Sequence, residues 1–356
     1  MIQFACQSQR NIPRSNGFSL VEVMVAMVIG LIGMLVTLQV YTLFEGQKRA
    51  TTGGADAMNN GAIALNGLTN DIQKGGYGIS SLNLVGCSTL LRTGVTLGTI
   101  APVTINSATI PAGDANTDTL VVVYGNNNTA PEGDGITSQP GTNSYAVATP
   151  TAYQVNDWVI ATPQTRAAPC ILDMDQVVSI VSPNLNVTTG EAGMTNGMLF
   201  NLGPAPRMQV YAIRNGNLTV CDYMANDCGL PANTGNTAIW VPIADNIVSL
   251  RAQYGQDTNT PMDGILDVYN QATPTTACGW MKTSAIQLAL VARNGQPEKT
   301  AVTGVAPVWS GSAATPINLT GTTVPTGFTW QNFRYRVFQT TVPIRNVSWK
   351  GVQTGC

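Results

Sequence analysis

The segment 18–44, FSLVEVMVAMVIGLIGMLVTLQVYTLF, constrains this chain most strongly, because its 27 residues carry only one charged side chain, Glu22. A helix of this length extends roughly 40 Å, and the hydrocarbon core of a bilayer is about 30 Å thick. The segment can therefore cross a membrane. Arg10 and Arg14 precede it and a long polar chain follows, so the positive-inside rule predicts a cytoplasmic N-terminus with the bulk of the chain on the other side.

Two common kinds of N-terminal segment compete as explanations of these residues. A secretory signal peptide has an apolar region of about 7 to 15 residues and a small-residue cleavage site, and this segment is longer and lacks the site. A plain signal anchor fits the length and the flanking charges but does not account for Glu22. A charged side chain inside a membrane helix costs on the order of 2.5 to 3.5 kcal/mol, so Glu22 indicates a function or a partner.

The residues GFSLVE, 17–22, resemble the processing site of type IV prepilins. The resemblance implies that prepilin peptidase cuts after Gly17 and that the amine of Phe18 is methylated. It also implies that Glu22 pairs with the N-terminal amine of a neighbouring subunit. Such pairing is physically sensible, because a lone carboxylate and a lone ammonium are each costly in a low-dielectric helix bundle. Residues 1–17 are then a leader, and the protein is a single-pass inner-membrane protein with a periplasmic head that later enters a pilus on the cell surface.

Apolar residues continue at spacings of three and four beyond the membrane segment, as on one face of a helix. They are Met58, Ala62, Leu65, Leu68 and Ile72. We expect a helix over 18–75 that ends at about Lys74, before the Gly-rich run GGYG. Four glycines, at positions 53, 54, 61 and 67, each weaken it by up to about 1 kcal/mol, so the helix needs support from packing on the head. A juxtamembrane stalk is the alternative.

From residue 85 to the C-terminus, short β-branched or aliphatic runs bounded by Gly, Pro, Asn and Asp predict a large β-rich head. These runs are 120–124, 158–160, 177–181 and 286–291. The clearest hairpin is MQVYAIRNGNLTVC, in which Asn215-Gly216 suits a type I′ turn. We expect loops at 102–118, 125–150 and 302–327, which are rich in Thr, Asn, Gly and Pro. The predicted fold class is α+β, a pilin spine helix followed by a disulfide-containing head.

Several islands resemble the minor pilin family called PilW. They are the GGYG exit, TDTLVVVYG, SLRAQYGQD, SAIQLALVAR and FRYRVFQTTVPIRN. The resemblance implies a low-abundance pilin that helps to prime pilus assembly and sits near the tip. Its implied partners are other minor and major pilins, prepilin peptidase, the inner-membrane assembly platform and a large tip-associated adhesin. Twitching, adhesion and DNA uptake stay open as the purpose of the filament.

Six cysteines lie outside the leader, and an even number on the exported side predicts three disulfides. Cys221 and Cys228 follow the hairpin and are close enough in sequence to pair. Of the fifteen possible connectivities, we favour the one that also joins Cys87 to Cys170 and Cys278 to Cys356. A zinc site is the alternative, although C-x-x-C pairs are absent.

Oxygen-bearing side chains gather in one short loop, at Asp257, Asn259, Asp263 and Asp267. A hard cation such as calcium favours oxygen ligands, so the loop is a candidate calcium site. It departs from the EF-hand template, because Pro261 stands where a ligand is needed. An acidic turn between strands is the alternative. We expect no other cofactor.

Composition excludes several functions. The chain has no histidine, which removes Ser-His-Asp and Cys-His catalysis and His-ligated zinc, so we predict that it is not an enzyme. The formal net charge is -2 and no basic patch lies beyond the N-terminus, which disfavours nucleic-acid binding. The functional alternatives to a minor pilin are a pseudopilin of type II secretion and a head that acts as a pilus-associated adhesin.

Overall fold

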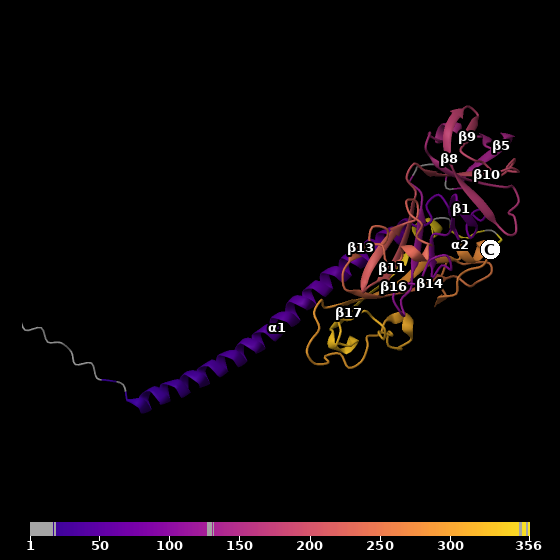
Figure 1. Cartoon of the computed structure of the whole chain (residues 1–356). Coiled ribbons are helices and arrows are strands. Elements are labelled where there is room, and N and C mark those ends of the chain that lie inside the picture. Colours follow the sequence, from indigo (N-terminus) through magenta and orange to yellow (C-terminus); the bar gives the residue numbers. More distant parts are fainter. Residues whose placement is uncertain (1–16, 18, 127–129, 131, 349–350, 354) are drawn as a thin grey trace, which may run out of the picture. The chain divides into compact units, whose positions relative to one another are not determined.

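The computed structural model describes residues 17, 19–126, 130, 132–348, 351–353 and 355–356. These residues form two compact units, of which the first ends at Thr52 and the second is Gly53–Cys356. Figure 1 follows the chain from the indigo N-terminal helix to the yellow C-terminal segments. Of the expected leader only Gly17 lies within the described residues, and Phe18 lies outside them.

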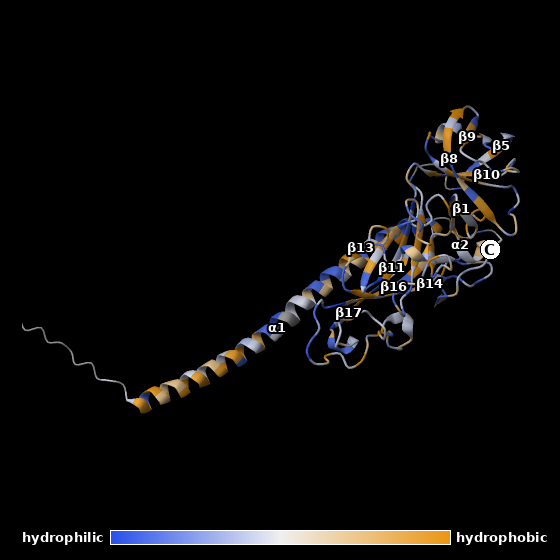
Figure 2. Ribbon diagram, in the orientation of Figure 1, coloured by the Kyte–Doolittle hydropathy of each residue, from blue (hydrophilic) through white to orange (hydrophobic). Residues whose placement is uncertain are grey.

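The longest element is helix α1, Leu20–Lys74, which contains 55 residues. Apolar residues dominate its N-terminal part, which is mostly orange in Figure 2, and polar residues become common after Phe44. Gly76 and Gly78 follow the helix with φ angles of +86° and +76°, a left-handed backbone that glycine adopts without steric cost. The helix therefore ends at Lys74, where the sequence pattern predicts its end.

The largest sheet has eight strands in the order β2-β1-β8-β7-β10-β5-β6-β9. The pair β1–β8 is parallel, and the other described pairs in this sheet are antiparallel. Its strands are β1 (Ser88–Arg92), β2 (Val95–Leu97), β5 (Asp134–Gly141), β6 (Ser144–Val147), β7 (Trp158–Thr162), β8 (Ile171–Val181), β9 (Asn184–Val187) and β10 (Met198–Gly203). Tyr145, Val177 and Leu185 belong to a core cluster of its own.

Two antiparallel sheets complete the second unit, with strand orders β13-β12-β11-β4-β3 and β15-β14-β16-β17. The first contains β3 (Val103–Ile105), β4 (Leu120–Tyr124), β11 (Arg207–Arg214), β12 (Asn217–Asp222) and β13 (Val241–Ala244). The second contains β14 (Ile247–Gln256), β15 (Val268–Asn270), β16 (Thr283–Arg293) and β17 (Tyr335–Pro343). Short helices are α2 (Ala277–Met281), α3 (Arg345–Ser348) and the 3-10 turns η1 (Pro150–Ala152), η2 (Pro231–Asn233), η3 (Ser310–Ser312) and η4 (Trp330–Asn332).

Strand β4 of the five-stranded sheet is buried on both faces. In β4, Leu120 and Val122 join the core cluster that also contains Ile72 of α1, whereas Val121 and Val123 join a second cluster. Successive side chains of a strand point to opposite faces, so both faces of β4 meet apolar neighbours. This explains why the strand reads as a continuous apolar run and not as an alternation.

The predicted fold class is confirmed, because a long apolar helix precedes a β-rich head with disulfides. All four apolar runs predicted as strands lie in strands β4, β7, β8 and β16. The predicted hairpin is β11–β12, and Asn215 and Gly216 at its turn have φ angles of 53° and 72°, as a type I′ turn requires.

Two expected loops were predicted wrongly. Segment 102–118 contains β3, and segment 125–150 contains β5 and β6. Their Thr, Ser and Gly residues suggest a loop, yet β5 and β6 supply Ile136 and Tyr145 to the core of the eight-stranded sheet. A few inward-facing apolar residues are sufficient for a segment to form a strand when neighbouring strands complete its hydrogen bonds.

Three disulfides link the six cysteines of the head. They join Cys87 to Cys170, Cys221 to Cys228 and Cys278 to Cys356, the pairs that the sequence favoured. The first closes the longest loop, with a sequence separation of 83 residues, and the third ties the last residue of the chain to α2. Each therefore restricts a different part of the unfolded head.

Candidate assembly site on the N-terminal helix

The first turn of α1 contains the one charged residue of the apolar segment. Glu22 is exposed, and in the described part of the chain no hydrogen bond or ion pair reaches its carboxylate. The position next to the helix N-terminus suits a carboxylate, because the first backbone N–H groups carry partial positive charge. Gly17, at the predicted cut, is exposed as well.

The helix surface that follows Glu22 is apolar and unburied. An 18-residue window of α1 has a mean hydropathy of 2.4 with none of it buried, and among the described residues this is the helix long and apolar enough to cross a membrane. Side chains such as Leu20, Leu31 and Leu43 are 76%, 62% and 66% exposed. So much apolar surface requires lipid or other apolar helices around it.

Polar groups inside this segment bond to their own helix. Thr37 Oγ1 donates to the Gly33 carbonyl at 2.6 Å, and Thr42 Oγ1 donates to the Gln39 carbonyl at 2.8 Å. Such bonds to the preceding turn satisfy a hydroxyl without an outside partner. The Glu22 carboxylate has no equivalent bond within the described residues, so it is the group of this segment that still needs a counter-charge.

The C-terminal part of α1, from Gly53 onwards, packs on the sheets of the head. Its buried residues are Ala57, Gly61, Ala64, Leu68 and Ile72. The sequence prediction was right for Leu68 and Ile72 and wrong for Met58 and Ala62, which are exposed. The buried residues of α1 near position 60 have small side chains, which allows a strand of the head to come close to the helix.

Gly61 shows this close approach most clearly. A Cβ atom placed on Gly61 would lie 2.2 Å from Cε2 of Phe338 on β17. One on Gly67 would meet no atom within 4 Å. A glycine whose low helix propensity weakens the helix thus makes the contact possible, and sequence periodicity could not identify it.

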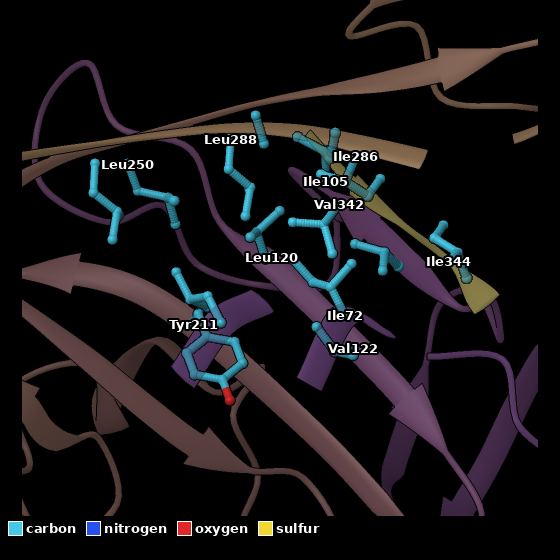
Figure 3. Packing of buried hydrophobic residues seen from close by; sticks show 14 of the residues in the cluster. Ile72, Ile105, Leu120, Val122, Tyr211, Leu250, Ile286, Leu288, Val342 and Ile344 are labelled. Carbon is cyan, nitrogen blue, oxygen red and sulfur yellow. The ribbon is translucent and has the colours of Figure 1, made fainter. Parts of the chain in front are cut away.

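Asp71 connects the last turn of α1 to the five-stranded sheet. Its carboxylate accepts hydrogen bonds from the hydroxyls of Tyr124, at 3.0 Å, and Tyr211. Figure 3 shows Ile72 and Tyr211 within the apolar packing at this point. Burial and the neighbouring Asp71 carboxylate raise the pKa of Tyr124 to about 12, and the same two causes, together with the hydrogen bond, raise the pKa of Tyr211.

Asn346 of α3 covers the end of the same helix. Its Nδ2 donates to the carbonyls of Lys74, at 2.8 Å, and Gly75, at 3.1 Å. The last carbonyls of a helix have no intrahelical donor, so this side chain satisfies groups that would otherwise need water. Sequence analysis missed Asp71, Tyr124, Tyr211 and Asn346, because residues 53 to 272 positions apart in the chain form these contacts.

The candidate calcium loop is held by its own backbone. Oδ1 of Asp257 accepts from the N–H of Asn259 at 2.9 Å, and Oδ2 accepts from the N–H groups of Asp263 and Gly264 at 2.8 and 2.7 Å. Burial raises the pKa of the Asp257 carboxyl, but these three donors and Lys282 outweigh it and hold the pKa below its usual value.

The remaining predicted ligands are engaged in the same way. Asp263 accepts from the side-chain amide of Asn259 at 3.0 Å, and Asp267 accepts from the N–H and the hydroxyl of Thr258 at 2.7 and 3.0 Å. No group of three or more His, Cys, Asp or Glu in the described residues is arranged to hold a metal ion. The geometry favours the acidic turn, and calcium binding stays a prediction.

Two family models match the sequence. Residues 210–346 match the type IV pilus-assembly protein W (PilW), and residues 12–38 match the prokaryotic N-terminal methylation motif. Among solved structures, a type IV-like pilin from Thermus thermophilus is similar over 82% of this chain and 96% of its own, with 10% identity and a TM-score of 0.32. No curated protein matches the sequence. The first match runs from β11 to the start of α3, and the second covers the predicted cut and the start of α1.

Proposed function

We propose that this chain, a type IV pilin-like protein with a PilW-type domain behind a prepilin methylation motif, is a minor subunit of a type IV pilus. In this proposal, prepilin peptidase removes residues 1–17 and the new terminus is methylated Phe18. Helix α1 holds the protein in the inner membrane with the head in the periplasm, until the assembly platform moves it into the filament. The observation that carries the proposal is an exposed apolar helix surface on which, within the described residues, one carboxylate, Glu22, has no partner.

Filament entry replaces lipid by other pilin helices around residues 20–44. Since lipid tails and apolar side chains are similar environments, this exchange supplies little free energy for choosing one register over another. A carboxylate that meets a cation in only one register favours that register, because an unpaired charge in the helix bundle is costly. The amine of Phe18 on a neighbouring subunit is the proposed cation, so Glu22 sets register more than it adds stability.

The part of α1 from Gly53 onwards belongs to the core of the head. Ala57, Ala64, Leu68 and Ile72 belong to the same buried cluster as residues of the five-stranded and four-stranded sheets. Residues 53–74 of α1 form one compact unit with the head and would enter a filament together with it. We therefore place it with other minor pilins near the pilus tip, as a subunit that primes assembly and lies beside the major pilins and a tip-associated adhesin.

A test compares Glu22→Gln with Asp56→Asn in cells that make the pilus. The glutamine side chain keeps the shape of glutamate and cannot form an ion pair, whereas Asp56 is an exposed acid beyond the apolar segment and serves as the control. We expect both variants to be processed at Gly17. Glu22→Gln should lower the amount recovered in sheared filaments by at least about tenfold, which corresponds to about 1.4 kcal/mol.

Quantitative immunoblots of membrane and filament fractions measure the share of each variant that is recovered in filaments. Equal filament recovery of Glu22→Gln and wild type would contradict the pairing role. Loss of both variants from filaments would mean that any change of charge on α1 blocks entry, and the specific role of Glu22 would again be refuted.

A further inference from the structure

A pocket of about 320 Å³ lies on the head, between strand β14 and the segment 309–318. Arg251 and Gln253 of β14 line one side, Asn116 and Gln271 lie beside them, and Trp309 and Ile317 belong to the facing segment. The volume falls within the range of small-molecule sites. Nothing in the assembly role described above uses this pocket.

The walls of the pocket are held in place by hydrogen bonds. Gln253 Nε2 donates to the Gly311 carbonyl at 2.8 Å, and Asn116 Nδ2 donates to the Thr320 carbonyl at 2.9 Å, so both ends of the facing segment are attached. Behind them, Trp309, Ile317 and Leu319 form a core cluster with Val248 and strand β16. A site with fixed walls loses less conformational entropy when a ligand binds.

The charge inside the pocket is balanced. Nη1 of Arg251 lies 3.3 Å from Oδ1 of Asp118 and donates to the Asn116 carbonyl at 3.2 Å. Asp118 is buried and also accepts from the N–H of Ala252 and from Gln271 Nε2, at 3.0 and 2.8 Å. An ion pair with both partners present is formally neutral, so a charged ligand would bring in a charge without a counter-ion.

Hydrogen-bonding capacity of both kinds is left over. In the described part of the chain, Nε and Nη2 of Arg251 have no acceptor, and the side-chain carbonyl oxygens of Gln253 and Gln271 have no donor. These groups share the lining with the exposed Pro316 and with the buried Trp309 and Ile317, which are 6% and 5% exposed. A ligand that fits must therefore have many groups that both donate and accept, an apolar face and no net charge.

We propose that this pocket binds an uncharged saccharide of one or two rings. Each sugar hydroxyl can donate to one protein group and accept from another, and the C–H face of a pyranose ring suits the apolar side of the pocket. The inference goes beyond subunit assembly, because it assigns the head a ligand that a pilus could carry to a surface.

The test uses the mature full chain in detergent. Thr315 lines the pocket and its exposed side chain has no hydrogen-bond partner among the described residues, so Thr315→Trp fills the opening and Thr315→Ser is the matched control. Saturation-transfer NMR is recorded with glucose, galactose, mannose, N-acetylglucosamine, N-acetylgalactosamine, lactose and maltose. The charged probes are glucuronic acid and N-acetylneuraminic acid. Equal near-ultraviolet circular dichroism of the three proteins verifies the fold.

We expect wild type and Thr315→Ser to bind at least one uncharged sugar and Thr315→Trp to bind it at least about tenfold more weakly. Absence of binding to every uncharged sugar, or binding of the two acidic sugars alone, would overturn the ligand class. Equal binding by a folded Thr315→Trp would overturn the location. A misfolded Thr315→Trp is replaced by Asn318→Trp, another exposed residue of the lining, with the same expected loss.

Discussion

Two carboxylates on helix α1, those of Asp71 and Glu22, have different surroundings. We therefore expect them to have different functions. Asp71 is half-buried and accepts hydrogen bonds from two tyrosine hydroxyls of the folded head. Glu22 is exposed and unpartnered within the described residues. A group satisfied inside one subunit stabilises that subunit, whereas an unsatisfied group inside an apolar segment needs a neighbour.

Buried tyrosines predict a loss of stability at alkaline pH. Burial raises the pKa of Tyr124, Tyr145, Tyr254 and Tyr335 to about 12, and nearby carboxylates add to the effect at Tyr124 and Tyr145. In the unfolded chain these hydroxyls ionise at about pH 10, so between pH 10 and 12 the unfolded state releases protons that the folded state keeps. The free energy of unfolding should be fully retained below pH 10 and should fall as the pH rises towards 12.

Chemical denaturation of the full chain in detergent at about pH 9 and about pH 11.5 measures this fall. Tyr254 is fully buried, and its pKa of about 12 would contribute at most about 3 kcal/mol. Tyr335→Phe removes one of the four groups and should make the pH dependence shallower. Equal stability at the two pH values would contradict this assignment.

Helix α1 is continuous, with an apolar, exposed N-terminal part and a C-terminal part that packs on the sheets of the head. The apolar residues 20–44 were predictable from the sequence, because a long uncharged run has few alternatives. The docking face was predicted only in part. Hydropathy selects large apolar residues such as Met58, but the structure places Ala57 and Gly61 against the sheet, since close packing favours small side chains there.

A matched pair of glycine substitutions tests the close approach of α1 to β17. Gly61→Ala should destabilise the head by about 1 to 3 kcal/mol, because the new methyl group would overlap the Phe338 ring. Gly67→Ala meets no atom within 4 Å and should stabilise the helix by up to about 1 kcal/mol. Thermal unfolding of the two variants shows whether each substitution stabilises or destabilises the protein. A Gly61→Ala protein as stable as Gly67→Ala would show that the helix does not lie this close to Phe338.

Some β strands were predictable from the sequence and others were not. The runs in β4 and β16 were visible in the sequence because they are apolar on both faces. Strands β5 and β6 contain many polar residues, and their partners β10 and β9 lie 40 to 65 positions away in the register pairs Leu199–Asp134, Met198–Gly135 and Tyr145–Leu185. β5 and β6 also pair with each other as a local hairpin, with Ile136 opposite Val147. Their many polar residues hide this hairpin in the sequence, and their outer pairings depend on segments far away in the chain.

At the scale of the whole molecule, the head is a large β-rich unit held by three disulfides and by one helix that it shares with the membrane segment. The PilW family model matches residues 210–346, which contain three of the five islands behind the PilW resemblance, whereas GGYG and TDTLVVVYG lie outside that match. The even number of cysteines predicted three disulfides, and proximity along the chain predicted Cys221–Cys228, whereas the other two pairs were a choice among the remaining connectivities. The contacts of Asp71 and the pocket beside Arg251 could not be predicted, because they depend on segments that only the fold brings together.

The disulfides should contribute unequally to stability. Cys87–Cys170 spans 83 residues and Cys221–Cys228 spans 7, and the loop-entropy model assigns them about 4 to 5 and about 2 to 3 kcal/mol. Replacing both cysteines of a pair by alanine should therefore lower the free energy of unfolding more for the first pair. Denaturant unfolding of the two double variants measures the order, and an equal or reversed order would contradict the model for this head.

We propose that this chain is a processed pilus subunit, and mass spectrometry of its N-terminal peptide from sheared filaments is the sharpest test. We expect a peptide that begins with N-methylated Phe18. An intact leader in cells with active prepilin peptidase, together with absence from the filament fraction, would show a plain membrane anchor and would contradict the proposed role of Glu22.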